Sequence, residues 1–363
     1  MSTPALFEPI TLRDLTIANR IWLAPMCQYS CFAEDGVPTD WHLVHLGSHA
    51  TGGFGLILTE AAAVVPDGRI SPQDAGIWNE EQATAWRRIV DFVHAQDSAI
   101  GVQLAHAGRK ASTYSPFADK EGSLPAAEGG WVTSAPSPIA FEGYDVPTAL
   151  SVTEIADLVG AFAAAARRAD EAGFDVVEIH AAHGYLLHEF LSPLSNQRDD
   201  QYGGDFAGRT RFLVEVVDAV RAVWPQGKPL FVRISATDWV DGGWTAQESA
   251  ELASALAPHG VDLIDASTGG NVLAEIPVGP GYQVEFAQSI REESGVPTAA
   301  VGLITEPGQA EKILTSDAAD AILLARVALR EPAWPLRAAH ELGVSRNDAP
   351  YRPQYVRGAW RDR

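Results

Sequence analysis

Residues 175–211 read DVVEIHAAHGYLLHEFLSPLSNQRDDQYGGDFAGRTR, and this stretch sets the pattern of the whole chain. It begins with the apolar run Asp175–His180, which predicts a buried strand. A charged, glycine-rich loop follows and leads into the helical pattern Gly208–Val223. Where the apolar run ends, His180, His183 and Tyr185 stand within six residues. Two imidazoles and a phenol at the end of a buried strand indicate one wall of an active site.

The same strand-then-helix unit recurs along the chain. Short runs rich in Val, Ile and Leu alternate with longer helical patterns, and near-continuous apolar runs are typical of a parallel sheet that is buried on both faces. Eight such units predict an α/β fold, a single (β/α)₈ TIM barrel; the pattern alone leaves a doubly wound open sheet as the alternative. The predicted strands are Ile21–Met26, Leu56–Val64, Ala99–His106, Asp175–His180, Leu230–Ser235, Asp262–Ser267, Thr298–Ile304 and Ala321–Leu329. The predicted helices are Glu80–Ala95, Thr153–Ala172, Gly208–Val223, Ala246–Ala257, Gln283–Ser294 and Glu306–Thr315.

Two segments do not fit the repeat. Phe7–Arg20 precedes the first strand and predicts a short N-terminal hairpin that closes the barrel bottom. Ala107–Leu150 is a long insertion after the third strand, rich in Gly, Pro and Ser. Loops of this length in a compact domain usually serve a function, so we expect a lid or subdomain over the site. The C-terminal tail is Asn347–Arg363. We expect residues 1–363 to form one domain.

Composition narrows the class of protein. The chain has 363 residues, 46% of them hydrophobic, and a formal net charge of −21. Such acidity argues against nucleic acid or an anionic membrane as a partner, because both attract basic surfaces. Two cysteines, Cys27 and Cys31, cannot form a disulfide framework and favour a reducing compartment. The first residues resemble no secretory signal, and no apolar run approaches the ~20 residues that span a bilayer. We therefore expect a soluble, cytoplasmic protein.

Polar and small side chains follow most of the predicted strands. In barrel enzymes, function gathers where the strands end. Each residue alone has an ordinary explanation: a buried thiol, a core aromatic, a hydrogen-bonded core histidine. Together they are harder to dismiss, since burying a polar group unpaired costs roughly 1–3 kcal/mol. The residues at the strand ends are Pro25–Tyr29, Glu60, Ala61, Gln103, His106–Lys110, His180, His183, Tyr185, Arg233, Gly302, Ala325 and Arg326.

A metal site is one interpretation of this set. His180 and His183, with Glu178 and His188 nearby, contain the ligand types of a metal-dependent barrel hydrolase. However, the neighbouring strand ends offer glutamine and arginine, and an arginine cation repels a metal ion. Arg326 follows a short apolar strand, where its planar fork of donors suits a phosphate. Residue chemistry therefore favours a phosphorylated organic cofactor, with the hydrolase as the alternative.

Several motifs then resemble one family. The chain is similar to the old yellow enzyme flavoproteins, which are FMN-dependent ene-reductases, and more narrowly to their thermophilic-like branch, which includes bacterial xenobiotic reductases. The resemblance spans nearly the whole chain. The motifs that carry it are Leu6-Phe-Glu-Pro, Asn19-Arg-Ile, Pro25-Met-Cys, Gln103-Leu-Ala-His-Ala-Gly-Arg-Lys, His180-x-x-His-Gly-Tyr, Ser195-Asn-x-Arg, Tyr202-Gly-Gly, Arg209-x-Arg-Phe, Val301-Gly-Leu-Ile-Thr and Tyr355-x-Arg.

The resemblance implies a non-covalent FMN that NADPH or NADH reduces. Cys27 would lie near the N5/O4 edge of the flavin, Gln103 would bind the pyrimidine ring, and Arg233 would face N1/O2, where a cation stabilises the charge of reduced flavin. Many relatives carry Gly before the phosphate-binding Arg, where this chain has Ala325. The implied cofactor residues are Ala24, Pro25, Met26, Cys27, Ala61, Gln103, Arg233, Gly302, Ala325 and Arg326.

The resemblance also implies a substrate, an electron-poor alkene such as an α,β-unsaturated carbonyl or a nitro compound. His180 and His183 would bind its activating oxygen, and Tyr185 would deliver a proton to the α-carbon after hydride leaves flavin N5. Tyr29 would contact the substrate from the opposite side. In this branch, tail residues corresponding to Arg357 and Trp360 would enter a neighbouring site, which implies a dimer or tetramer.

Two other functions stay open beside the ene-reductase. One is the metal-dependent hydrolase, and the other is a flavin-binding sensor without turnover. Larger relatives with an iron–sulfur cluster are excluded, because two cysteines cannot supply its four ligands.

Overall fold

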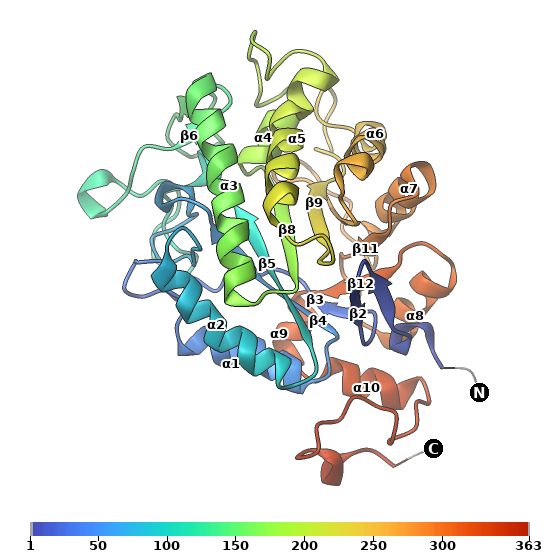
Figure 1. Ribbon diagram of the computed structural model, residues 1–363. Coiled ribbons are helices and arrows are strands. Elements are labelled where there is room, and N and C mark those ends of the chain that lie inside the picture. Colours follow the sequence, from blue (N-terminus) through green and yellow to red (C-terminus); the bar gives the residue numbers. More distant parts are fainter. Residues whose placement is uncertain (1–2, 362–363) are drawn as a thin grey trace.

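The structure, a computed structural model, describes residues 3–361 (Figure 1). Eight parallel strands close into a barrel in the order β10-β11-β12-β3-β4-β5-β8-β9. The closed barrel confirms the (β/α)₈ prediction and excludes the alternative, a doubly wound open sheet. The barrel strands are β3 (Ile21–Leu23), β4 (Leu56–Ala63), β5 (Ala99–Ala105), β8 (Val176–Ala181), β9 (Leu230–Ser235), β10 (Leu263–Ser267), β11 (Thr298–Ala300) and β12 (Ala321–Leu324).

Helices surround the barrel. Sequence patterns predicted six of them to within about two residues at each end. Their starts follow capping chemistry: Ser151 and Thr245 each form a capping box with the glutamate three residues later. The helices are α1 (Asp40–Thr51), α2 (Glu80–His94), α3 (Val152–Ala172), α4 (Leu186–Leu191), α5 (Phe206–Val223), α6 (Ala246–Leu256), α7 (Val284–Ser294), α8 (Pro307–Thr315), α9 (Arg326–Arg330) and α10 (Trp334–Glu341).

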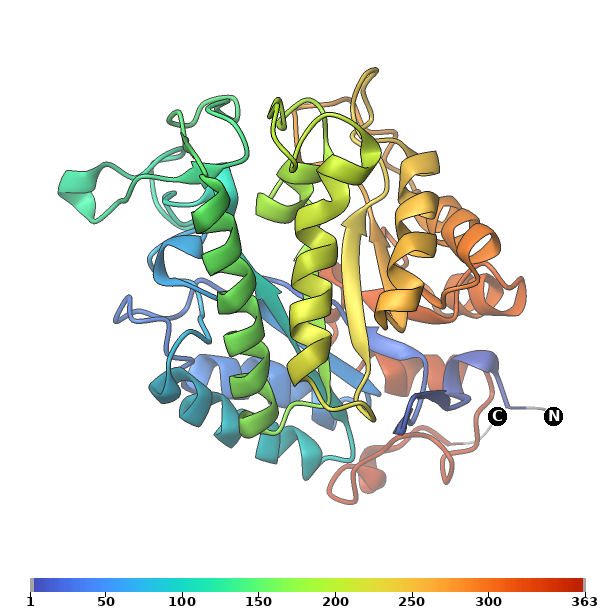
Figure 2. The same cartoon turned by 45° about the horizontal axis from the view of Figure 1, so that its top comes forward.

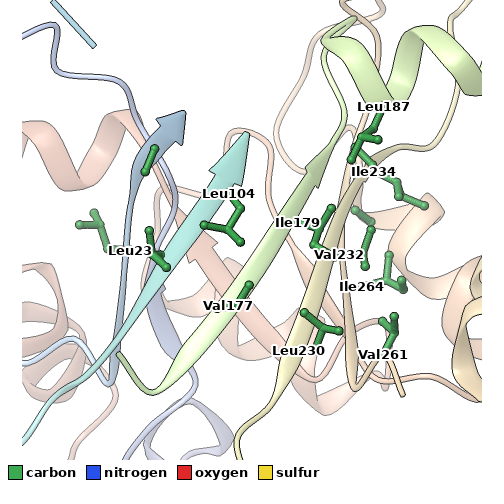
Figure 3. Packing of buried hydrophobic residues seen from close by; sticks show 14 of the residues in the cluster. Leu23, Leu104, Val177, Ile179, Leu187, Leu230, Val232, Ile234, Val261 and Ile264 are labelled. Atoms are coloured by element: carbon green, nitrogen blue, oxygen red, sulfur yellow. The ribbon is translucent and has the colours of Figure 1, made fainter. Parts of the chain in front are cut away.

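The apolar residues form two cores. One fills the barrel interior, where the rings of Trp22 and Phe231 stack 5.8 Å apart. The larger core lies between the strands and the helices, and Figure 3 shows part of it, including Leu104, Ile179 and Val232. Alternate residues of each strand enter one core or the other, which explains why the strands are apolar throughout. Fully burying a side chain of this size stabilises the fold by roughly 1.5–3 kcal/mol.

The N-terminal segment forms an antiparallel hairpin, β1 (Ile10–Leu12) and β2 (Leu15–Ile17). Leu12 and Ile17 are buried in the same cluster as the barrel-interior residues Trp22 and Phe231. The hairpin therefore covers the end of the barrel where the strands begin.

Three predicted strands are longer than the observed ones by three residues or more. Ile21–Met26 ends at Leu23, Thr298–Ile304 ends at Ala300, and Ala321–Leu329 ends at Leu324. The third difference is a wrong prediction of element type, because residues 326–330 form helix α9. A short apolar run cannot distinguish strand from helix by periodicity. The sequence patterns also missed α1, α4 and α10.

The insertion and the tail lie on opposite sides of the barrel (Figure 2). The insertion contains β6 (Ser134–Ala135), β7 (Thr148–Ala149) and two 3₁₀ turns, Gly108–Lys110 and Ala126–Glu128. It leaves the barrel directly after β5, at the ends of the strands. Among residues 3–361, no helix combines the length and apolarity that crossing a membrane requires.

Candidate active site

A cavity of about 240 Å³ opens where β9 to β12 end. Three arginines line it, Arg233, Arg326 and Arg330, so the cavity is strongly cationic. It brings together four residues that the sequence assigned to a cofactor: Arg233, Gly302, Ala325 and Arg326. Four other members of the wall belong to a motif of the resemblance but had no assigned role: Val301, Leu303, Ile304 and Thr305. The sequence had not marked the remaining members as site residues: Ser267, Tyr282, Gln283, Leu323, Val327 and Arg330.

Gly302 forms part of this cavity through its backbone. Its φ of +118° is a conformation that side-chain-bearing residues rarely adopt. A Cβ atom there would lie 2.9 Å from Gln283 Nε2. The chain can therefore expose its backbone to a ligand at this point, next to Arg326. Cations beside an exposed backbone fit a phosphate group.

The segment after β3 carries Ala24, Pro25, Met26, Cys27 and Tyr29. The backbone N–H of Ala24 donates to Leu324 O, over 3.0 Å, and joins this segment to β12. Burial, reinforced by the negative charges of nearby acids, raises the pKa of the Cys27 thiol well above its usual value. Cys27 is therefore a neutral thiol at neutral pH.

A second contact holds the same segment. The backbone N–H of Gln28 donates to Glu60 Oε2, over 3.0 Å, and Glu60 Oε1 lies 2.9 Å from His42 Nε2. Glu60 is buried, and it links the segment after β3 to the start of α1.

The turn after β8 presents the two histidines and Tyr185. His183 and Gly184 both have positive φ, +60° and +70°. A Cβ atom at Gly184 would lie 2.1 Å from Gly270 O, so only glycine fits there. The backbone N–H of His183 donates to Ser235 Oγ (2.8 Å), and its carbonyl accepts from Lys110 Nζ (2.8 Å). Neighbouring strands and the insertion thus hold this turn in one conformation.

His180, His183 and Tyr185 converge. The ring of His180 lies 5.2 Å from each of the other two rings, measured between centroids. Nε2 of His183 lies 2.7 Å from Ser267 Oγ. Within the described residues, the buried Nδ1 atom of His180 has no hydrogen-bond partner.

Burial sets the charge of these three groups. It lowers the pKa of both histidines well below the usual value, and the positive charge of Arg233 lowers it further. Burial also raises the pKa of Tyr185 well above its usual value. At neutral pH the site therefore holds two neutral imidazoles and a protonated phenol, which are hydrogen-bond and proton donors.

Two further cavities flank Tyr185. The narrower one places the predicted cofactor residue Ala61 beside His180 and Tyr185. The wider one brings Tyr29 and Tyr185 together, beneath insertion residues 113–122 and Tyr144. The structure thus brings Tyr29, His180 and Tyr185, which were predicted to contact the substrate, to two cavities that meet at Tyr185.

Lys110 is a site residue that the sequence marked only as part of a motif. Its Nζ atom lies 5.0 Å from the centre of the Tyr185 ring and also donates to Gly270 O, over 2.9 Å. Burial lowers the pKa of Lys110 to about 8. Nothing in the local pattern distinguishes a buried lysine of this kind from a solvated one.

The surroundings of His180 and His183 do not fit a metal ion. The described residues contain no group of three or more His, Cys, Asp or Glu side chains placed to hold one. The charges that act on both histidines come from Arg233, Lys110 and His188, and each is positive when the group is ionised.

Arg357 and Trp360 lie apart from this site within the chain. The Trp360 ring stacks on His340 of α10, 5.3 Å between centroids. Earlier in the tail, Arg352 Nη1 lies 3.1 Å from Asp97 Oδ2, just before β5 begins. The tail therefore packs near the opposite end of the barrel (Figure 2).

The chain matches known proteins along nearly its full length. Residues 5–344 match the family model described as NADH:flavin oxidoreductase / NADH oxidase. An NADPH dehydrogenase of Geobacillus thermodenitrificans is 48% identical over 357 residues, which cover 98% of each chain. An NADPH dehydrogenase of Bacillus subtilis is 47% identical over 354 residues, which cover 97% of this chain and 98% of the relative.

Solved structures agree with these matches. An old yellow enzyme homologue from Zymomonas mobilis aligns with a TM-score of 0.78 at 29% identity, covering 98% of this chain and 99% of its own. Morphinone reductase in complex with tetrahydroNAD aligns with a TM-score of 0.78 at 29% identity, covering 94% and 92%.

Proposed function

This chain belongs to the NADH:flavin oxidoreductase / NADH oxidase family, and from that membership we propose that it reduces electron-poor alkenes. It is an enzyme of the old yellow enzyme type, an FMN-dependent oxidoreductase that takes its electrons from NAD(P)H. The proposal concerns the substrate class and the residues that act on it. One observation carries it: the two neutral histidines and the protonated Tyr185 converge in one place.

The residues at the strand ends fit FMN. The arginine-lined cavity with the exposed backbone of Gly302 suits the phosphate, and Arg326 would hold it together with Ala325. Gln103 and Arg233 would contact the pyrimidine end of the ring, with Ala24, Pro25, Met26, Cys27 and Ala61 along its length. When bound, FMN supplies hydride from N5.

His180 and His183 bind the activating oxygen of the substrate in this proposal. Negative charge grows on that oxygen as hydride reaches the β-carbon, so hydrogen-bond donors placed there lower the activation barrier of the reaction. A preorganised donor of this kind is typically worth ~3 kcal/mol. The turn geometry supports the assignment, because hydrogen bonds to Ser235 and Lys110 fix His183 before a substrate arrives.

Tyr185 delivers the proton to the α-carbon. A general acid must carry its proton at the working pH, and burial keeps the phenol protonated. Lys110, 5.0 Å from the ring centre, stabilises the negative charge that Tyr185 acquires when the proton leaves.

The mouth of the site is assigned to substrate recognition. Tyr29 contacts the substrate opposite Tyr185, and the insertion covers them as a lid. Arg357 and Trp360 act from the tail of a neighbouring subunit in a dimer or tetramer. Both residues are exposed on the tail, away from the site of their own chain, which supports an action in trans.

Spectroscopy tests the proposal directly. The purified protein should be yellow, NADPH should bleach the flavin absorbance, and cyclohexenone should restore it. A flavin that NADPH reduces but no alkene reoxidises would instead indicate a sensor. A colourless protein that FMN cannot reconstitute, or a stoichiometric bound metal, would refute the assignment.

A further inference from the structure

Below the cofactor cavity, the barrel interior contains a layer of buried polar side chains. Gln103, Glu178, Arg233 and Asp265 come from the adjacent strands β5, β8, β9 and β10. Gln103 pairs in register with Glu178, and Arg233 pairs with Asp265. Neighbours in register point to the same face of a sheet, so each pair presents its side chains to the interior. All four side chains are at least nine-tenths buried.

Glu178 has one polar partner in this layer. Gln103 Nε2 donates to Glu178 Oε1 over 2.8 Å. Within residues 3–361, the other carboxyl oxygen, Oε2, is buried without a hydrogen bond. The contact also orients Gln103, because its amide nitrogen faces Glu178 and its amide oxygen remains available for a ligand.

Asp265 is better compensated. Its Oδ2 atom lies 2.9 Å from Arg233 Nε. The layer therefore contains two carboxyl groups, Glu178 and Asp265, and one cation, Arg233, all buried from solvent. Burying an ionised carboxylate is costly unless a cation pairs with it, and the single positive charge of Arg233 pairs closely with Asp265. The neutral member is then Glu178, because its hydrogen bond is with the uncharged Gln103 and the cation contacts Asp265.

The electrostatic balance agrees with this geometry. Burial, and then the charge of Asp265, raise the pKa of Glu178 to about 8, while Arg233 and Gln103 oppose them. Burial raises the pKa of Asp265 less, to about 6, because Arg233 opposes it. Strand β5 contributes only an uncharged amide. Asp265 and Arg233 are therefore the charged groups that act on Glu178.

We propose that Glu178 is a positioning residue that takes up a proton when the cofactor is reduced. The inference rests on the proposed contacts of FMN with Gln103 and Arg233. Hydride from NAD(P)H brings two electrons and one proton, so the cofactor region gains one negative charge. That charge disfavours a nearby carboxylate. In the pH range where Glu178 is ionised before reduction, its carboxylate binds one proton from solvent, and the added charge is neutralised.

The pH dependence of the flavin midpoint potential tests this step. One proton per two electrons corresponds to ~30 mV per pH unit, because a tenfold change is ~30 mV for a two-electron couple. Above pH ~8 the slope of the wild-type holoenzyme should rise toward twice that value. Glu178→Gln should show the shallower slope throughout, since an amide cannot titrate. If Glu178 only anchored Gln103, Glu178→Gln would change the affinity for FMN, but its potential would have the same pH slope as that of wild type.

Glu189→Gln is the matched control. Glu189 is equally buried, and burial raises its pKa to about 8 as well. However, it lies on α4 and accepts from the backbone N–H of Arg109, over 2.9 Å, away from the cationic cavity. The Glu189→Gln holoenzyme should retain the steeper slope. A wild type without the change in slope, a Glu178→Gln variant that keeps it, or a Glu189→Gln variant that loses it would each overturn the inference.

Proton uptake provides a second test, with Glu178→Gln as the comparison because the pKa of Lys110 is also about 8 and the variant should lack the extra uptake. Reduction of the wild-type holoenzyme in weakly buffered dye solution should take up about one more proton per flavin at pH ~9 than at pH ~7. Equal uptake at both values would overturn the inference. Failure to bind FMN would refute the proposed cofactor site instead, and failure to reduce any alkene would refute only the proposed substrate class.

Discussion

His188 Nε2 lies 3.1 Å from Asp238 Oδ1, and both side chains are completely buried. His188 Nδ1 accepts a hydrogen bond from the backbone N–H of Gly184, over 2.9 Å. The pair therefore supports the strained turn that presents Tyr185 and joins it to the segment after β9. Precise placement of the two histidines and the phenol depends on contacts of this kind beneath the site.

Replacing Asp238 should destabilise the fold. Asp238→Ala leaves His188 buried without its partner, and breaking a buried pair in this way costs ~3–5 kcal/mol. Urea unfolding at pH 7 measures the loss. Asp119 is exposed, so Asp119→Ala should change the free energy of unfolding by less than ~0.5 kcal/mol.

The Asp238 carboxylate should also make the free energy of unfolding depend on pH in the acidic range. Burial raises the pKa of Asp238, but His188 and the hydrogen bonds outweigh it, and the pKa falls to about 2. Its contribution is therefore fully present above the ordinary pKa of ~3.9 and is lost as the pH falls toward 2. Unfolding measured from pH ~5 to ~2.5 should show a smaller decrease in stability for Asp238→Ala than for wild type.

Tyr185→Phe should slow one half-reaction. Loss of a general acid reduces the rate by about 10²–10⁴-fold, so alkene reduction should slow by that order. Reduction of the flavin by NADPH should change little, because it needs no proton from Tyr185. Stopped-flow absorbance separates the two steps. Equal slowing of both would contradict the proton-donor role.

His180→Ala combined with His183→Ala should abolish binding of phenols. Phenolate ligands stacked on flavin produce a long-wavelength charge-transfer band, and the band should disappear when both oxygen-binding donors are removed. His94→Ala serves as the control, because His94 is half-exposed and pairs with Asp175 on the outside of the barrel. Persistence of the band in the double variant would remove these histidines from substrate binding.

Arg326→Ala should weaken FMN binding through the phosphate alone. A hydrogen bond to a charged group contributes ~1.5–3 kcal/mol, which corresponds to roughly a 10- to 150-fold weaker affinity. Quenching of flavin fluorescence by the apoprotein measures it. Riboflavin, which lacks the phosphate, should bind wild type and Arg326→Ala equally well. An equal loss for both flavins would place Arg326 elsewhere in the site.

Mixed oligomers can test the tail. If Arg357 acts in a neighbouring site, Arg357→Ala and Tyr185→Phe subunits mixed together should regain activity, because one site of the pair is then intact. If Arg357 acts in its own chain, every site in the mixture stays defective. The expected result is recovery of a fraction of wild-type alkene reduction after subunit exchange, measured against each variant alone.

Much of the fold follows from local patterns. The run Leu230–Ser235 was predicted with the same bounds as β9, because a buried parallel strand is apolar along its whole length. The starts of α3 and α6 were likewise predicted to within one residue, and capping boxes at Ser151 and Thr245 account for them. Residues 326–330 were the clearest error, since RVALR has the composition of a strand yet forms a short helix beside the cavity.

For the candidate site, too, some features follow from the sequence and others only from the tertiary structure. The sequence by itself determined which residue types stand at the strand ends, and motif resemblance added the roles implied for His180, His183 and Tyr185. Only the tertiary structure decided which groups meet: Lys110 beside Tyr185, and Glu178 bonded to Gln103. Those contacts join different strands and loops, so their distances and burial depend on barrel closure. No local pattern encodes the low-polarity surroundings that keep the histidines neutral and the phenol protonated.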